Sequence, residues 1–286
     1  MYKNPLSKLS DMSDNEHEDS RGSRHCFFQP VTHCIFELDG LLIDSERLRT
    51  ESVQKILDTY GHTYSFDIKL RCMGKPESDL ADVVVSSFNL PIGRTEFENQ
   101  HELQCRGNLG KINLMPGVER LLKHLHASNV PMAIGSNSSR DSFRIKTRRH
   151  SRLFDAVFHH VVLSGSDGEV KKAKPAPDVF LAAASRFEDP PEPAKCLVFE
   201  SSLPGMEAAL AAGMQVVLVP DPLVSVRMSA AATLRLRSLK DFKPQYFGFP
   251  ALSSCSRRIR NLRGKITYPP RMFAVLYLIS IFSVFV

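Results

Sequence analysis

Two acidic residues near the start of the chain are the first candidates for chemistry. Residues 33–36 (HCIF) form a short apolar run, and the turn signal Asp39-Gly40 follows it, so the run is predicted to be a buried strand. Glu37 and Asp39 then stand at the end of this strand. Because ligands of α/β proteins bind at the carboxyl ends of strands, we predict a binding or catalytic site there. The alternative for Asp39 is a purely structural role in the turn.

A hydroxyl group stands at the end of a second predicted strand, residues 130–135 (VPMAIG). Ser136 and Asn137 follow this run and precede a predicted helix. A hydroxyl group and backbone N–H groups at the start of a helix are an arrangement that binds phosphate. Ser136 and the backbone of Asn137 are therefore candidate ligands of a phosphoryl group. A Ser-Asn-Ser-Ser loop is also an ordinary helix cap, and the two interpretations stay open.

Two further charged residues are candidates for the same site. Lys174 opens the segment 174–177 (KPAP), whose prolines favour a rigid loop that aims the lysine and then begins a helix. Glu200 follows the apolar run 196–199 (CLVF), and Ser201 comes next. Carboxylates are protein ligands that Mg²⁺ prefers, whereas a neutral hydroxyl does not compensate a divalent charge. Of this pair, only Glu200 is therefore a carboxylate that could hold a cation.

The elements that must position these residues alternate along the chain. Apolar strands that alternate with amphipathic helices indicate a parallel sheet covered on both faces, which is a doubly wound α/β fold. Beyond residues 33–36, strands are predicted at 130–135, 156–163, 196–199 and 215–219, and helices at 44–60, 118–127, 141–150, 178–187 and 205–212. Residues 61–115 carry further helical patterns and no convincing strand. We therefore expect an α/β core at 31–44 and 116–250, with a small helical cap at 45–115 inserted after the first strand.

The candidate segments together resemble the haloacid dehalogenase (HAD) superfamily. Residues 37–46 (ELDGLLIDSE) are similar to its first motif, in which Asp-x-Asp-Gly is followed by an apolar pair and then Asp-Ser/Thr-Glu. Ser136, residues 174–180 (KPAPDVF) and residues 200–209 are similar to its second, third and fourth motifs, in the same order. Strings such as 73–75 (MGK) resemble the animal pseudouridine 5'-phosphatase group. The resemblance implies a Mg²⁺-dependent phosphatase that acts on a small sugar or nucleoside monophosphate.

The resemblance also implies a role for each matching residue. Such a phosphatase needs a nucleophile, an acid/base, a cation, a donor to the phosphoryl oxygens and Mg²⁺. The implied catalytic residues are Glu37, Asp39 and Lys174, the substrate-binding residues are Ser136, Asn137 and Lys75, and the metal ligands are Glu37, the carbonyl of Asp39 and Glu200. For Lys75, which would help to close the cap over the substrate, the alternative is a surface lysine after a helix that ends at glycine.

Two positions depart from the family pattern. Glu37 stands where the family has its nucleophilic aspartate, and Ser201 stands where the fourth motif has its second acid. The extra methylene group moves the carboxylate by about 1 Å, and an error of that size costs about 100-fold in rate. We therefore expect phosphatase activity to be reduced or lost, with a weakened Mg²⁺ site. The alternative is a pseudoenzyme that binds phosphorylated metabolites or a protein partner.

Charge and cysteine content bear on the partners and the compartment. The chain has 37 lysines and arginines against 31 acids, but seven of these cations and no acid lie from Phe242 onward. The rest of the chain, with 30 cations and 31 acids, is close to neutral, so we expect no nucleic-acid partner. The six cysteines are scattered without a C-x-x-C pair, and residues 1–30 do not look like a signal peptide. These features predict reduced thiols in the cytoplasm.

Both terminal segments look different from the α/β part. Residues 1–30 are polar and mixed in charge, which is typical of a disordered leader. Residues 251–286 are basic and then apolar, and the apolar stretch 272–286 would span about 22 Å as a helix. That length falls short of the roughly 30 Å hydrocarbon core of a membrane. Two interpretations stay open for this tail: a weak membrane anchor, or a segment outside the fold that comes from a splice form or a gene-model error.

Overall fold

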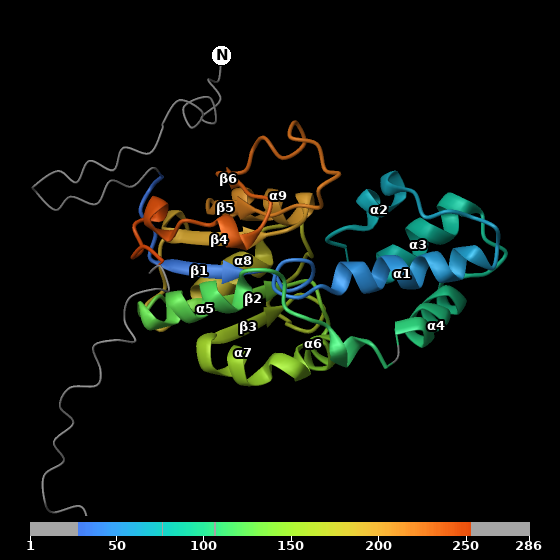
Figure 1. Cartoon of the computed structure of the whole chain (residues 1–286), viewed down its shortest axis with the longest axis horizontal. Coiled ribbons are helices and arrows are strands. Elements are labelled where there is room, and N and C mark those ends of the chain that lie inside the picture. Colours follow the sequence, from blue (N-terminus) through green and yellow to red (C-terminus); the bar gives the residue numbers. More distant parts are fainter. Residues whose placement is uncertain (1–27, 76, 106, 253–286) are drawn as a thin grey trace, which may run out of the picture. The chain divides into compact units, whose positions relative to one another are not determined.

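A six-stranded parallel sheet lies at the centre of the protein, with strand order β3-β2-β1-β4-β5-β6 (Figure 1). Its strands are β1 (His33–Phe36), β2 (Met132–Ser136), β3 (His160–Leu163), β4 (Cys196–Glu200), β5 (Gln215–Leu218) and β6 (Leu234–Arg235). Strand β1 lies between β2 and β4, so the residues that follow these three strands meet at one edge of the sheet. This edge is where the sequence places its candidate site.

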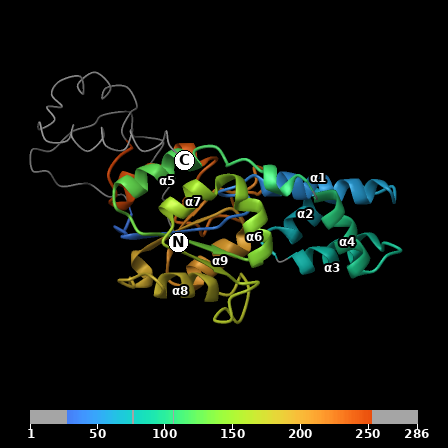
Figure 2. The same cartoon turned by 90° about the horizontal axis from the view of Figure 1, so that it is seen from below.

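The computed structural model describes residues 28–75, 77–105 and 107–252. Every residue of β1, β2 and β4 is buried, because helices cover both faces of the sheet. Helices α5 (Val118–Ala127) and α7 (Ser151–Val157) pack on one face, and α8 (Asp178–Ser185) and α9 (Leu203–Ala211) pack on the other, as Figure 2 shows. The predicted doubly wound α/β fold is confirmed.

The segment between β1 and β2 contains a group of four helices that pack on one another: α1 (Ser45–Asp58), α2 (Phe66–Cys72), α3 (Glu77–Phe88) and α4 (Arg94–Cys105). Their buried side chains, which include Val53, Leu80 and Phe97, form a separate hydrophobic cluster. No strand occurs within the described part of residues 45–105. We call these helices the cap. Where the chain leaves the core and returns to it, Ile43 and Leu114 form an antiparallel bridge.

The region around α7 differs from the prediction. A strand was expected at 156–163, but residues 156 and 157 end α7, and β3 begins only at His160. Phe154 and Val157 are both buried, so the apolar residues that suggest a strand belong partly to a short helix. The helix expected at 141–150 is α6 (Arg140–Thr147), which a 3-10 turn at Arg148–His150 connects to α7. The two-residue strand β6 has no counterpart in the prediction.

The terminal predictions lie mostly outside the described residues. Residues 1–27 and 253–286, which contain most of the predicted leader and nearly all of the tail, are not described. At the end of the predicted leader, the ring of Phe28 stacks on Phe247 with centroids 4.7 Å apart, and the N–H of Phe28 donates to the carbonyl of Tyr246. Among the described residues, no helix is long and apolar enough to cross a membrane.

Candidate active site

Glu37 directly follows β1, and all three donors around its carboxylate come from the sheet edge. Its backbone N–H continues the ladder to β4 by donating to the carbonyl of Phe199 at 3.0 Å. The hydroxyl of Ser136 donates to Oε1 at 2.6 Å, and the N–H of Asp39 donates to the same oxygen at 3.3 Å. The ammonium group of Lys174 donates to Oε2. Both carboxylate oxygens of Glu37 are therefore engaged within the protein.

Lys174 reaches this edge from the loop before α8, as its proline frame predicts. Its side chain is 1% exposed, and Nζ also donates to Glu200 Oε1 at 2.7 Å and to the carbonyl of Gly135 at 3.0 Å. Burial lowers the pKa of Lys174 below its usual range, and the carboxylate of Glu200 opposes this shift. One buried cation thus lies between two carboxylates and compensates part of their charge.

Glu200 ends β4 and is completely buried. Its second oxygen, Oε2, accepts hydrogen bonds from the N–H of Ser201 at 2.8 Å and from the N–H and hydroxyl of Ser202 at 3.0 and 3.1 Å. A Cβ atom at Gly205 would lie 1.9 Å from Glu200 Oε1, so the close approach of α9 to this carboxylate requires glycine. Glu200 therefore holds the start of α9 and pairs with Lys174.

Asp39 has a separate set of partners. The hydroxyl of Ser138 donates to Oδ2 at 2.7 Å, and the ammonium group of Lys146 forms an ion pair with Oδ1 at 3.0 Å. Burial alone would raise the pKa of Asp39, but Lys146 and Ser138 outweigh it and lower the pKa to about 2. Asp39 is therefore a carboxylate at neutral pH. Lys146 lies on α6, and the sequence pattern does not distinguish it from the other cations of that basic helix.

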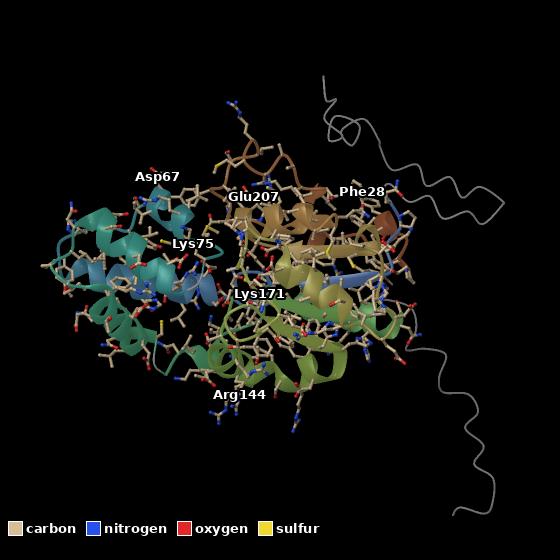
Figure 3. The ribbon with its side chains drawn as sticks, turned by 180° about the vertical axis from the view of Figure 1, so that it is seen from behind. Phe28, Asp67, Lys75, Arg144, Lys171 and Glu207 are labelled. Atoms are coloured by element: carbon tan, nitrogen blue, oxygen red, sulfur yellow. The ribbon has the colours of Figure 1, made fainter. Side chains whose placement is uncertain are left out.

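Asn137 connects the core to the cap. Its side-chain N–H donates to the carbonyl of Gly74 at 2.9 Å, and its side-chain oxygen accepts from the hydroxyl of Ser164 at 2.7 Å. Gly74 precedes Lys75, which lies between the cap helices and the core in Figure 3. A second contact between cap and core is the ion pair of Lys69 with Asp221 at 2.8 Å.

A cavity of about 180 Å³ lies among these residues. Of the residues predicted from the sequence, four line it: Glu37, Asp39, Lys75 and Asn137. The other three, Ser136, Lys174 and Glu200, are buried at the sheet edge and do not line it. Lys146 and the cap residue Arg49, neither of which is predicted as a site residue, also line the cavity. The structure thus brings the predicted residues into one region but separates them into those that face the cavity and those that do not.

The residues at this edge do not fit Mg²⁺ as they are arranged. The hydroxyl of Ser201 donates to the carbonyl of Asp39 at 3.0 Å, which is the carbonyl predicted to bind the metal. Both oxygens of Glu37 and of Glu200 already accept hydrogen bonds. The described residues contain no group of three or more histidines, cysteines or acids that could hold a metal ion. This geometry does not support metal binding by Glu37, Asp39 and Glu200, which stays a prediction.

The fold and the site define an α/β protein with a charged site under a helical cap, at the carboxyl end of a parallel sheet. The family described as haloacid dehalogenase-like hydrolase matches residues 34–219, and the chain belongs to this family. The resemblance predicted from the motifs is confirmed. Members of the family are typically Mg²⁺-dependent.

Curated relatives align with most of the α/β part and the cap. A protein of Drosophila melanogaster named as a probable pseudouridine-5'-phosphatase is 48% identical over 223 residues, which are 78% of this chain and 96% of the relative. A protein of Arabidopsis thaliana named (DL)-glycerol-3-phosphatase 2 is 40% identical over 223 residues, 77% of this chain and 92% of the relative.

Solved structures share the fold. A β-phosphoglucomutase from Clostridium difficile has a TM-score of 0.61 at 20% identity and covers 76% of this chain and 95% of its own, a likeness that concerns the fold alone. A haloacid dehalogenase-like protein from Agrobacterium tumefaciens has a TM-score of 0.62 at 25% identity, over 74% of this chain and 95% of its own.

Proposed function

We propose that this protein binds small phosphomonoesters in the cavity under the cap and hydrolyses them slowly through Glu37. The observation that carries the proposal is that Glu37 and Asp39 both face one small cavity, beside the ammonium group of Lys146. Lys75 and Lys146 line this cavity, and their ammonium groups suit an anionic ligand. The names of the Drosophila and Arabidopsis relatives support the same class of substrate.

In the proposed reaction, Glu37 is the nucleophile and Asp39 is the acid/base. An oxygen of Glu37 attacks phosphorus, the bond from phosphorus to the leaving oxygen breaks, and Asp39 gives its proton to that oxygen. Water then attacks the phosphorus of the acyl phosphate, the bond from phosphorus to the Glu37 oxygen breaks, and Asp39 accepts a proton from the water. Inorganic phosphate leaves and the Glu37 carboxylate is restored. Lys174 compensates negative charge on Glu37 throughout.

Two contacts support slow turnover. The donors around Glu37 engage both of its oxygens, so one hydrogen bond or ion pair must break before an oxygen can attack. Lys146 and Ser138 hold Asp39 in its charged form, with a pKa of about 2, so little of it carries the proton that a leaving alkoxide needs at neutral pH. The first of these contacts also favours a second candidate function, in which the protein binds phosphorylated metabolites or a protein partner without hydrolysing them.

Phosphate release separates the two functions. The purified chain is assayed against a panel of nucleoside and sugar monophosphates, with and without Mg²⁺, beside the variants Glu37→Ala and Glu37→Asp. We expect slow release by the wild type, none by Glu37→Ala, and a rise of about 100-fold in Glu37→Asp, where the carboxylate returns to the family position. Equal release by the wild type and a folded Glu37→Ala variant would contradict hydrolysis through Glu37 and favour the binding function.

We also propose a reducing compartment, the cytoplasm, for this protein. The four cysteines that the structure describes, Cys34, Cys72, Cys105 and Cys196, are free thiols and buried. Burial raises the pKa of Cys34 and Cys196, which keeps these thiols protonated and unreactive. A small phosphorylated metabolite from the same compartment is the partner that the cavity supports.

A further inference from the structure

The donors around Glu37 form a site for an anion. The hydroxyl of Ser136, the N–H of Asp39 and the ammonium group of Lys174 come from three separate segments and converge on one carboxylate. The hydroxyl of Ser136 in turn accepts from the N–H of Ser138 at 3.3 Å, which leaves its proton directed to Glu37. A carboxylate and a phosphoryl group accept the same kinds of hydrogen bond, so these donors suit either one.

Glu37 separates these donors from the cavity. Glu37 is one of the residues that line the cavity, and its side chain is 9% exposed. The side chain of Lys174 is 1% exposed, Ser136 is completely buried, and neither residue lines the cavity. A ligand in the cavity therefore meets the Glu37 carboxylate first and reaches Ser136 or Lys174 only if this carboxylate moves away.

We propose that Glu37 is an internal anion that occupies the oxyanion site formed by Ser136, Lys174 and the N–H of Asp39. The proposal rests on the proposed function in one respect, because it takes a phosphoryl group as the competing ligand. The side chain of Glu37 therefore inhibits phosphoryl binding. A phosphoryl group must displace the Glu37 carboxylate before it can accept hydrogen bonds from Ser136 and Lys174. The local charge acts in the same direction, because Glu37 and Glu200 together outweigh Lys174 and repel an incoming anion.

Shortening residue 37 should open the oxyanion site without leaving Lys174 unpaired. In a Glu37→Ala variant, Lys174 keeps its ion pair with Glu200 at 2.7 Å and its bond to the carbonyl of Gly135. The hydroxyl of Ser136 and the N–H of Asp39 lose their acceptor and become available to a ligand. We therefore expect the shortened variant to fold and to gain affinity for a tetrahedral oxyanion.

The experiment is a calorimetric titration of the full chain with inorganic phosphate, for wild type, Glu37→Ala and Glu46→Ala. Glu46 is the matched control, because it also lines the cavity, but its carboxylate pairs with Arg49 and not with Ser136 or Lys174. We expect Glu37→Ala to bind phosphate at least about 10-fold more tightly than wild type, since hydrogen bonds to a charged group contribute this much, and Glu46→Ala to change affinity by less than about 3-fold. Adding Ser136→Ala to Glu37→Ala should reverse most of the gain.

Two results would overturn the proposal. One is a phosphate affinity of Glu37→Ala no higher than that of Glu46→Ala, which would mean that only the overall charge of the cavity matters. The other is a gain in Glu37→Ala that survives the loss of Ser136. Thermal unfolding checks that each variant is folded, and Glu37→Ser replaces Glu37→Ala if the alanine variant is not. A lack of phosphate release from every monophosphate would contradict the proposed hydrolysis but not this inference, because the titration needs no turnover.

Discussion

The two carboxylates that follow β1 have similar partners but different surroundings. Glu37 and Asp39 lie two residues apart, and each contacts one serine and one lysine. We call the buried group the inner cluster and the other group the outer cluster. The inner cluster consists of Glu37, Ser136, Lys174 and Glu200, and the outer cluster consists of Asp39, Ser138 and Lys146.

Access to the cavity is the main difference between the two clusters. In the inner cluster only Glu37 faces the cavity, and the side chains of Lys174 and Glu200 are 1% and 0% exposed. In the outer cluster Asp39, Ser138 and Lys146 all line the cavity. The inner cluster therefore satisfies its own charges and donors, whereas the outer cluster can exchange partners with a ligand. The motifs of this chain match the family closely, yet the longer side chain of Glu37 occupies the groups, Ser136 and Lys174, that would bind a phosphoryl group.

The largest expected effect is the loss of the inner lysine. Lys174→Met leaves the carboxylates of Glu37 and Glu200 buried without a cation, and breaking a buried ion pair in this way costs about 3–5 kcal/mol of folding free energy. Urea unfolding measures the loss. The exposed Lys172, two residues earlier, provides the control Lys172→Met, for which we expect no measurable change. Equal stability of the two variants would show that the inner cluster does not depend on its cation.

A smaller effect is expected at the outer cluster, and it depends on pH. The pKa of Asp39 is about 2 in the folded protein and about 3.9 in an unfolded chain, so the unfolded state binds more protons between these values. Asp39 therefore contributes about 2.6 kcal/mol of stability above about pH 5, and this contribution is lost progressively as the pH falls towards 2.

Lys146→Met should remove this acid-dependent contribution, because Lys146 supplies the cation that keeps Asp39 charged. The unfolding free energy is measured from pH 5 downward for wild type, Lys146→Met and Arg144→Met. Arg144 lies on the outer side of the same helix, α6, and is the matched control (Figure 3). An acid dependence that is the same in all three proteins would mean that the ion pair of the outer cluster does not stabilise the fold.

Ser201 lies between the two clusters, and a change there tests the metal fit. Ser201→Asp removes the hydrogen bond to the carbonyl of Asp39 and places a carboxylate beside it, which should cost about 1 kcal/mol in the absence of a divalent cation. Mg²⁺ should then stabilise the variant, by about 2.7 kcal/mol when its free concentration is 100 times its dissociation constant. The stability of wild type should not change with Mg²⁺. Thermal unfolding with EDTA and with Mg²⁺ measures both. A Mg²⁺-dependent stabilisation of wild type would contradict the poor fit described above.

The smallest effect is expected outside both clusters, at the ion pair between cap and core. Lys69 and Asp221 are 19% and 17% exposed at their side chains, and such a partly exposed pair contributes about 0.5–1 kcal/mol. Lys69→Met should lower the unfolding free energy by this amount. Its effect should decrease in high salt, unlike that of Lys174→Met, because salt screens exposed pairs more than buried ones. A salt-independent loss would indicate that packing of the lysine stem carries the contribution.

The sequence predicts most of the fold because the strands are fully buried. Strands β1, β2 and β4 are short apolar runs, and turn or motif residues follow each of them directly. Helix α7 has only seven residues, and its two buried apolar residues are Phe154 and Val157. So short an apolar pattern does not distinguish a helix from a strand. Strand β6 has two residues and therefore no run to detect.

The sequence also predicts which site residues meet, but not their partners. Glu37, Ser136 and Glu200 converge because the ends of adjacent parallel strands meet at one edge. Lys146 could not be distinguished, because several cations stand on the same short helix and only packing decides which one turns inward. The sequence also does not predict the hydrogen bonds that Glu37 and Glu200 accept. A hydrogen bond is lost when donor and acceptor move apart by about 1 Å, and the sequence does not fix atomic positions that closely.

A crystal structure of the Glu37→Ala variant grown with inorganic phosphate would test the occupied oxyanion site most directly. We predict a phosphate with its oxygens within hydrogen-bonding distance of the Ser136 hydroxyl and the Lys174 ammonium group, at the position that the Glu37 carboxylate fills in wild type. Phosphate bound only in the outer part of the cavity, with Ser136 and Lys174 turned to other protein partners, would contradict the account.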